Sequence, residues 1–309
     1  MPLAVAVRSG FPESQHVGAA VVLAPDGSVA ERHGEVDALV YPRSALKPFQ
    51  TVAALRAGVR LRPEQQVIVT ASHTGTERHL TVVRSVLADA GLTEDALKTP
   101  PAWPASTDAA RVRVEQGQGP ARIAMNCSGN HAGMLAAARA SGWPIDDYLA
   151  PDHPVHALSR SVLAEFSGAE PSFPGTDGCG GPVWAVPLTA LARGYQRLFA
   201  EERGLAVAIR EHPELIEGEG TPTTRAVAAL GIVAKSGAEG VWAAVASDGS
   251  SVAVKVLDGS GRAAAAIAVA LLAGRGAVDP ALAAAYLDDP ALAVLGGGRP
   301  VGRIRVSVG

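Results

Sequence analysis

Apolar positions along the chain follow two different periods. Residues 3–7 and 17–23 are short, apolar and rich in β-branched side chains, which predicts strands, and the turn residues Pro25-Asp26-Gly27 lead to a further strand at 28–32. After Ser44 the apolar positions recur with helical spacing as far as Leu55. The chain therefore begins with strands and then changes to helix.

The middle third is predicted to be mainly helical, with loops between the helices. Helical periodicity covers residues 63–71, 79–90, 129–140, 153–166, 187–199 and 201–211. A proline-rich stretch at 99–106 and a glycine-rich stretch at 174–182 interrupt the pattern and predict loops.

Strands return toward the C-terminus. Short apolar runs at 232–235, 241–246 and 252–256, with a hairpin turn at 247–250, precede helices at 263–273 and 280–287 and a last strand at 303–308. We expect an α/β (α+β) fold with one mostly antiparallel sheet built from N- and C-terminal strands, flanked by helices. The expected single domain has a sheet subdomain (about 1–60 and 222–309) and a helical subdomain (about 61–221).

Composition narrows the function classes. The 309 residues are 48% hydrophobic and 18% charged with a net charge of -3, which gives no electrostatic reason to expect nucleic acid or an anionic membrane as partner. The apolar stretch at 263–274 is too short to span a bilayer, which takes about 20 residues. The N-terminus lacks the basic and apolar pattern of a secretory signal, so we expect a cytoplasmic protein.

Lysine is rare, and two lysines lie beside serines. The four lysines are Lys47, Lys98, Lys235 and Lys255, and arginine carries the other positive charges. Ser44 and Lys47 are spaced i, i+3 at a helix start, which puts a hydroxyl next to an amine that can take its proton. A helix cap followed by a surface lysine is the alternative interpretation of Ser44 and Lys47.

Three further clusters of polar and glycine residues stand out, at 71–75, 126–133 and 177–182. The first alone is typical of a helix end. The other two contain Cys127 and Cys179, which admit a disulfide, part of a zinc site or two inert thiols.

Taken together, these segments resemble the asparaginase II family, the Rhizobium-type or class 3 L-asparaginases. The motifs, in order, are YPRSALKPFQ (41–50), ASHTG (71–75), NCSGNHAGM (126–134), DGCG (177–180) and AKSGAEG (234–240). The resemblance covers nearly the whole chain. It implies a fold similar to serine β-lactamases and glutaminases, and hydrolysis of L-asparagine to L-aspartate and ammonia.

The resemblance also implies roles for particular residues. Two Ser–Lys pairs of the family fall on Ser44 with Lys47 and on Ser72 with Lys235. In this interpretation Ser44 attacks the amide, Lys47 accepts its proton, and Ser72 with Lys235 passes a proton to ammonia. Candidates for binding the substrate are Arg43, His73, Asn126, Asp177, Gly178 and Glu239; Arg43 is equally a candidate structural brace.

A zinc site of the family maps onto Cys127 and Cys179, but its lysine ligand falls on Asn130. An uncharged amide is a poor zinc ligand, and His131 is the alternative third donor. We therefore expect no required cofactor, and zinc to be weakly bound or absent. We also expect the two cysteines to lie within a few ångströms of each other.

The sequence is also compatible with three other functions. A glutaminase differs by one methylene of substrate, which the sequence does not resolve. A penicillin-recognising β-lactamase or D,D-peptidase shares the fold, and a non-catalytic metal- or ligand-binding module is supported by the cysteine loops alone. For the favoured asparaginase, the expected partners are a small-molecule substrate and a second copy in a homodimer.

Overall fold

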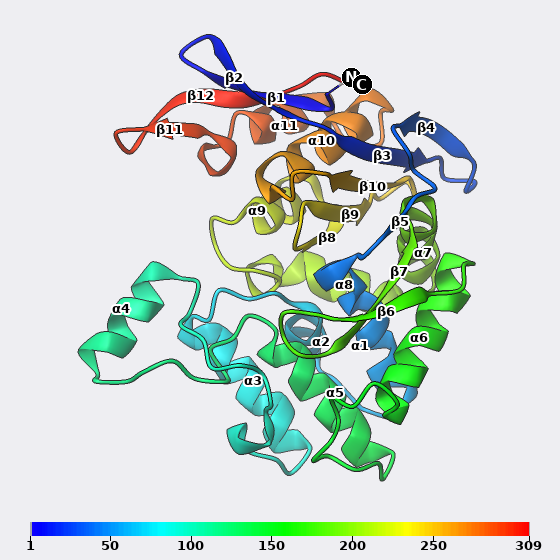
Figure 1. The fold of residues 1–309 in the computed structure, drawn as a ribbon, viewed down its shortest axis with the longest axis vertical. Coiled ribbons are helices and arrows are strands. Elements are labelled where there is room, and N and C mark those ends of the chain that lie inside the picture. Colours follow the sequence, from blue (N-terminus) through cyan, green and yellow to red (C-terminus); the bar gives the residue numbers. More distant parts are fainter. Residues whose placement is uncertain (1, 309) are drawn as a thin grey trace.

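Strands that pair antiparallel and a group of helices make up the computed structural model, which describes residues 2–308 (Figure 1). This is the mixed α/β fold that the sequence predicts. The strands are β1 (Ala4–Arg8), β2 (Phe11–His16), β3 (Gly18–Leu23), β4 (Val29–His33), β5 (Leu39–Val40), β6 (Ser172–Thr176), β7 (Pro182–Pro187), β8 (Val233–Gly237), β9 (Val241–Val245), β10 (Ser251–Val256), β11 (Val294–Gly296) and β12 (Arg299–Val306).

Most helices fall where the periodicity places them. They are α1 (Lys47–Arg56), α2 (Pro63–Thr70), α3 (Glu77–Asp89), α4 (Thr107–Glu115), α5 (Ser128–Ala140), α6 (Pro154–Ser167), α7 (Leu188–Glu201), α8 (Arg203–Glu211), α9 (Pro222–Leu230), α10 (Gly261–Gly274) and α11 (Pro280–Leu287). Short 3-10 turns are η1 (Arg43–Leu46), η2 (Glu94–Ala96), η3 (Pro213–Leu215) and η4 (Pro290–Leu292).

The expectation of one terminal sheet is wrong, because the terminal strands form two sheets. One has the order β11-β12-β1-β2 and the other β4-β3-β10-β9-β8. Each sheet joins N-terminal to C-terminal strands, as expected. The chain changes sheets between His16 and Gly18, where a Cβ on Gly18 would lie 2.0 Å from the Lys255 carbonyl oxygen. A third sheet, of order β5-β7-β6, includes both ends of the stretch predicted to be a glycine-rich loop, and residues 177–181 form the loop between β6 and β7.

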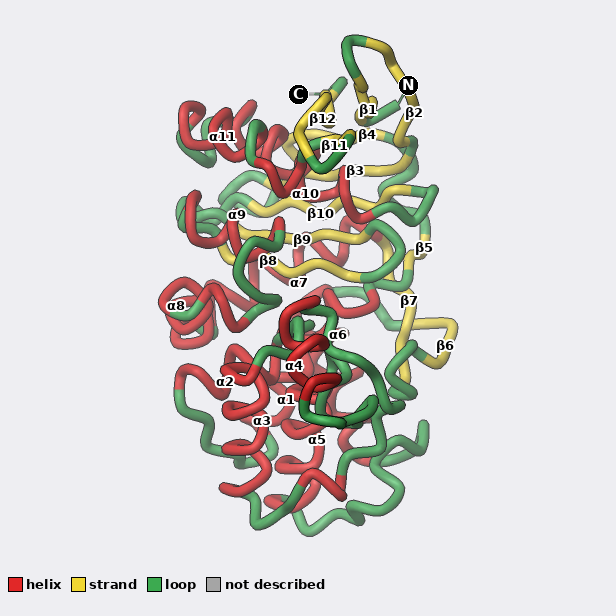
Figure 2. Tube along the Cα trace, turned by 90° about the vertical axis from the view of Figure 1, so that its left-hand side faces the viewer, coloured by secondary structure: helices red, strands yellow, loops and turns green. Residues whose placement is uncertain are grey.

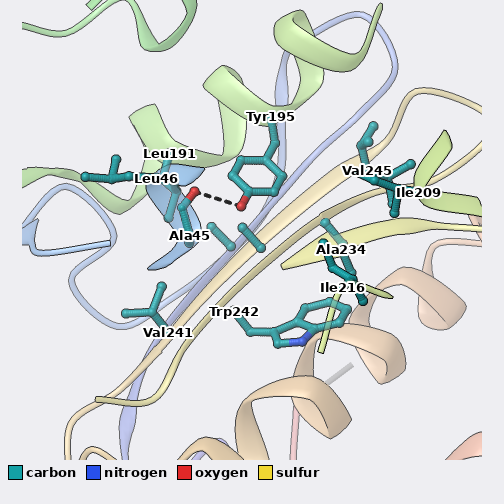
Figure 3. Packing of buried hydrophobic residues seen from close by; sticks show 14 of the residues in the cluster. Ala45, Leu46, Leu191, Tyr195, Ile209, Ile216, Ala234, Val241, Trp242 and Val245 are labelled. Carbon is teal, nitrogen blue, oxygen red and sulfur yellow. Dashed lines mark hydrogen bonds between the residues drawn. The ribbon is translucent and has the colours of Figure 1, made fainter. Parts of the chain in front are cut away.

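The strands of the five-stranded sheet contribute many buried residues to the hydrophobic core. Every residue of β9 is buried, and α7 and α10 both pack on β9 and β10. Figure 3 shows Ala45 and Leu46 of η1 packed with Leu191 and Tyr195 of α7 and with Val241 of β9, and the Tyr195 hydroxyl donates to the Ala45 carbonyl over 2.8 Å. The turn that carries Ser44 is therefore fixed against the core.

Helices α1, α2, α3, α5 and α6 pack against one another in the lower half of the molecule (Figures 1 and 2). Figures 1 and 2 show α1, α2 and α5 below β8, and β8 contacts η1, the turn that leads into α1. Within residues 2–308, no helix has the length and apolar character needed to cross a membrane.

Candidate active site

Ser44 lies in η1, and Lys47 begins α1 directly after it. Arg43, which precedes Ser44, has a left-handed φ of 54°, a strained conformation for a residue with a side chain. A Cβ on Gly237 of β8 would lie 2.2 Å from the Pro42 carbonyl oxygen, so this edge of the sheet presses on the same turn. Packing from both sides holds the half-buried Ser44 next to β8.

Lys47 is 3% exposed, and its amine contacts the second serine motif. Its Nζ donates to the Ala71 carbonyl over 2.5 Å and to the Ser72 hydroxyl over 3.0 Å. The Lys47 backbone N–H donates to the Ser44 carbonyl, but within residues 2–308 the Lys47 amine makes no hydrogen bond to the Ser44 hydroxyl. The resemblance pairs Lys47 with Ser44, whereas the contact that the structure shows joins Lys47 to Ser72.

Ser72 is held by backbone hydrogen bonds to two loops. The Ser72 N–H donates to the Ile216 carbonyl over 2.9 Å, and the Thr74 N–H donates to the Glu217 carbonyl over 2.6 Å. Between them, the His73 N–H donates to the Asn126 carbonyl over 3.0 Å. The motif at 71–75 therefore leaves α2 as an extended segment lying between 126 and 216–217.

Lys235 lies in β8 and is 1% exposed. Its Nζ donates to the Ser236 carbonyl over 2.8 Å and lies 3.7 Å from the Glu217 carboxylate. Burial lowers the pKa of Lys235 to about 8, with the charge of Lys47 acting in the same direction and that of Glu217 against it. An amine with that pKa is partly neutral at mildly alkaline pH, so it can exchange protons.

Glu217 is the buried acid of this site that the sequence motifs did not include. It lies in the segment Glu217-Gly218-Glu219-Gly220, whose composition is typical of an exposed turn. The carboxylate accepts a hydrogen bond from the Ser236 hydroxyl and faces Lys235. In the sequence, the one signal for this acid is the isolated lysine at 235, because a buried lysine needs a negative charge nearby.

Two of the substrate-binding candidates occupy contrasting positions. His73 is buried, its Nε2 lies 2.8 Å from the Ser128 hydroxyl, and its ring stacks on His79. Burial holds the pKa of His73 well below its usual range, so the ring is neutral. Asn126 is exposed, and its side-chain oxygen accepts from the Cys127 thiol over 3.1 Å.

Of the other candidates, Asp177 and Gly178 lie in the hairpin loop between β6 and β7, Arg43 contacts this loop, and Glu239 lies in the turn between β8 and β9. Asp177 Oδ1 accepts from Arg43 Nε over 2.8 Å and from the Gly178 N–H over 2.6 Å. Arg43 and Asp177 therefore largely neutralise each other, and Arg43 braces the loop. Glu239 is exposed with a left-handed φ of 60°, and it adds negative charge near Arg43.

The structure brings Cys127 and Cys179 together as free thiols. Cys127 caps α5 and Cys179 lies in the β6–β7 loop, and both side chains are buried. A hydrogen bond from Cys179, with the charge of Lys47 beside it, lowers the pKa of Cys127, while the same hydrogen bond raises the pKa of Cys179. The two thiols therefore interact with each other, and the Lys47 amine lies beside Cys127.

The residues around these thiols do not fit a zinc site. The Asn130 side chain donates to the Val69 carbonyl over 3.0 Å, so it braces α2. His131 points its Nδ1 to the Tyr148 hydroxyl over 2.8 Å. Among residues 2–308, no three His, Cys, Asp or Glu side chains are grouped as metal ligands. Two thiols alone fall short of the four ligands of a structural zinc ion.

A cleft of about 1020 Å³ lies beside the buried groups, between α3, α4 and residues 214–221. Thr74, Gly75 and Glu214 line it, whereas Ser44, Lys47 and Lys235 do not. Lys47 and Lys235 are thus buried beside this cleft, whereas Asn126, Gly178 and Glu239 are exposed.

Buried amines beside serine hydroxyls are the groups that nucleophilic hydrolases use. Comparison with protein families agrees: the L-asparaginase II model matches residues 4–306. The chain belongs to the L-asparaginase II family. This family consists of amidohydrolases, the class of enzyme that the motifs predict. No curated protein matches the chain.

Solved structures give distant similarities. A structure of Mglu in its glutamate form has 14% identity and a TM-score of 0.45 over 86% of this chain, which spans 63% of that protein. A β-lactamase from Mycobacterium bovis has 17% identity and a TM-score of 0.43, covering 83% of this chain and 94% of that one. A Bacillus glutaminase has 15% identity and a TM-score of 0.31, covering 77% and 83%. These scores are too low to bear on the chemistry.

Proposed function

We propose that this protein hydrolyses L-asparagine to L-aspartate and ammonia through its serine and lysine side chains. The observation that carries the proposal is the contact of the buried Lys47 amine with the Ser72 hydroxyl, 3.0 Å apart. Membership of the L-asparaginase II family supports the substrate class.

In the proposed reaction, the Ser44 oxygen attacks the side-chain amide carbon and its proton passes to Lys47 Nζ, which accepts it in its unprotonated form. The lysine then returns this proton through the Ser72 hydroxyl to the departing nitrogen, which leaves as ammonia. Water next attacks the aspartyl ester on Ser44 and transfers a proton to the amine, and the ester oxygen regains a proton as L-aspartate leaves. The Lys47–Ser72 contact supports the relay, and Lys235 supplies a second amine at the site.

The same contact makes Ser72 the rival nucleophile, because Ser72 is the serine with an amine already bonded to it. Trapping the enzyme with a slowly hydrolysed asparagine analogue decides between them by peptide mass. We expect the added mass on the peptide that contains Ser44 and loss of turnover in Ser44→Ala. Label on Ser72 with turnover retained in Ser44→Ala would exchange the two roles.

Substrate class is tested by ammonia release from L-asparagine and L-glutamine, and by cleavage of a chromogenic cephalosporin. We expect release from L-asparagine, abolished in Ser44→Ala. Faster release from L-glutamine would make the protein a glutaminase, cephalosporin cleavage would favour a penicillin-recognising enzyme, and no turnover of any of them would favour a binding module. The cytoplasmic location and the homodimer stay predictions.

A further inference from the structure

Glu217 joins the two halves of the site, although no sequence motif includes it. Its side chain is 11% exposed, and Oε1 lies 3.7 Å from Lys235 Nζ. The Ser236 hydroxyl donates to the same oxygen. A carboxylate this deeply buried is costly unless a charge or hydrogen-bond donors compensate it, and here both do.

The backbone around Glu217 is fixed to the other serine motif. Its carbonyl accepts the Thr74 N–H, and the preceding Ile216 carbonyl accepts the Ser72 N–H. Gly218 allows this approach, because a Cβ there would lie 2.2 Å from Thr74 Oγ1, and its φ of 146° is one that L-residues rarely adopt. One short segment therefore orients Ser72 with its backbone and Lys235 with its side chain.

We propose that Glu217 is a positioning residue of the amidohydrolase site, which orients Lys235 and Ser236 and sets the charge state of Lys235. This inference rests on the proposed function for its meaning in catalysis. The contacts that carry it lie within the chain and are independent of any substrate. Glu217 acts through Lys235, without touching the substrate.

The charges around Lys235 predict how its pKa responds to the loss of Glu217. Among residues 2–308, the titratable groups that act on it are Glu217 before α9, Lys47 from α1 and Cys127 at the start of α5. The adjacent strand β9 contributes none, because its sequence is VWAAV. Glu217 is the one carboxylate in this set, and its charge raises the pKa of Lys235 against the effect of burial. Removing that charge should therefore lower the pKa of Lys235 further below 8.

The rarity of lysine makes this measurable directly. With isotope-labelled lysine the protein gives signals from four side chains, and Lys98→Arg and Lys255→Arg assign two of them. We expect Glu217→Gln to lower the pKa of Lys235 by roughly one unit in an NMR titration. The acidic limb of the kcat/KM profile should move to lower pH by the same amount. Glu217→Asp keeps the charge farther away and should give an intermediate value.

Glu219→Gln is the matched control, since it removes an exposed carboxylate two residues along the same segment. It should leave the titration of Lys235 unchanged. If Glu217 were purely structural, both Glu217 variants would lose stability or activity but leave the pKa of Lys235 unchanged. That result would overturn the inference. The titration needs no substrate, so absent asparaginase activity would refute the proposed function while leaving this inference to be decided by the NMR result.

Discussion

The two buried lysines have contrasting surroundings. Lys47 donates to the Ala71 carbonyl and to the Ser72 hydroxyl, both of the second motif, and the Cys127 thiol lies beside it. Lys235 instead lies near the Glu217 carboxylate and contacts Ser236 beside it in β8. A neutral acceptor such as a serine hydroxyl can exchange a proton with the amine, whereas a carboxylate favours its charged form. Under the proposed function we therefore place Lys47 in the proton relay and expect Lys235 to act as a second amine whose pKa Glu217 raises.

Replacing either lysine by arginine tests this comparison with the largest expected effect. Arginine keeps the positive charge but stays protonated, since its pKa lies above about 12. We expect Lys47→Arg to lower kcat by about 10³-fold, within the range for loss of acid–base catalysis, and Lys235→Arg to cost less. Steady-state ammonia release measures kcat, and circular dichroism checks the fold. Full activity in both variants would show that charge alone is needed, and the Ser–Lys mechanism would be abandoned.

A substitution at Gly237 tests how closely the two regions must approach. An alanine Cβ would collide with the Pro42 carbonyl oxygen at 2.2 Å, pushing β8 away from the turn that carries Ser44. We expect Gly237→Ala to lower the free energy of unfolding by about 2 kcal/mol and to lower kcat by about tenfold.

Gly204→Ala in α8 is the control for Gly237→Ala, because nothing lies within 4 Å of an added Cβ there. Denaturant unfolding should show it to be neutral or slightly stabilising. Equal stability of the two alanine variants would show that the approach of β8 to the turn is not tight in solution.

Much of the fold was predictable because its elements have one buried face or are buried throughout. The helices predicted at 153–166 and 280–287 correspond closely to α6 and α11. α4 was missed because none of its residues is buried, so its sequence carries no apolar period. The strand β6 was missed because Ser172–Thr176 contains Pro and Gly, residues that normally interrupt strands. The division into two sheets depends on long-range pairing, which local patterns do not encode.

The site was predictable to the extent that its residues belong to recurring motifs. The rarity of lysine selected Lys47 and Lys235, and both are buried next to serines. The contact of Lys47 with Ser72 was not predictable, since residues 25 positions apart meet only through the packing of α1 on α2. Glu217 was missed for the same reason: its neighbours along the chain suggest a solvated turn, and its role comes from β8.

Removing metal with a chelator should have the smallest effect on activity, and it tests the part of the site next to Lys47. A zinc ion held by both thiols would displace their protons and place a divalent cation near Lys47, whereas Lys235 lies near the Glu217 carboxylate. The position that the family resemblance assigns to a lysine ligand is Asn130, whose side-chain amide donates a hydrogen bond to the Val69 carbonyl.

We therefore predict that activity in chelator-treated enzyme equals that of untreated enzyme, with less than one zinc per chain by elemental analysis. Cys179→Ser is the matched variant, since it replaces the thiol with a hydroxyl, and its activity should likewise be insensitive to added zinc. One zinc per chain, with activity lost on chelation and restored by zinc, would show that a further ligand completes the thiol pair in solution, and Lys47 would then have to work beside a cation.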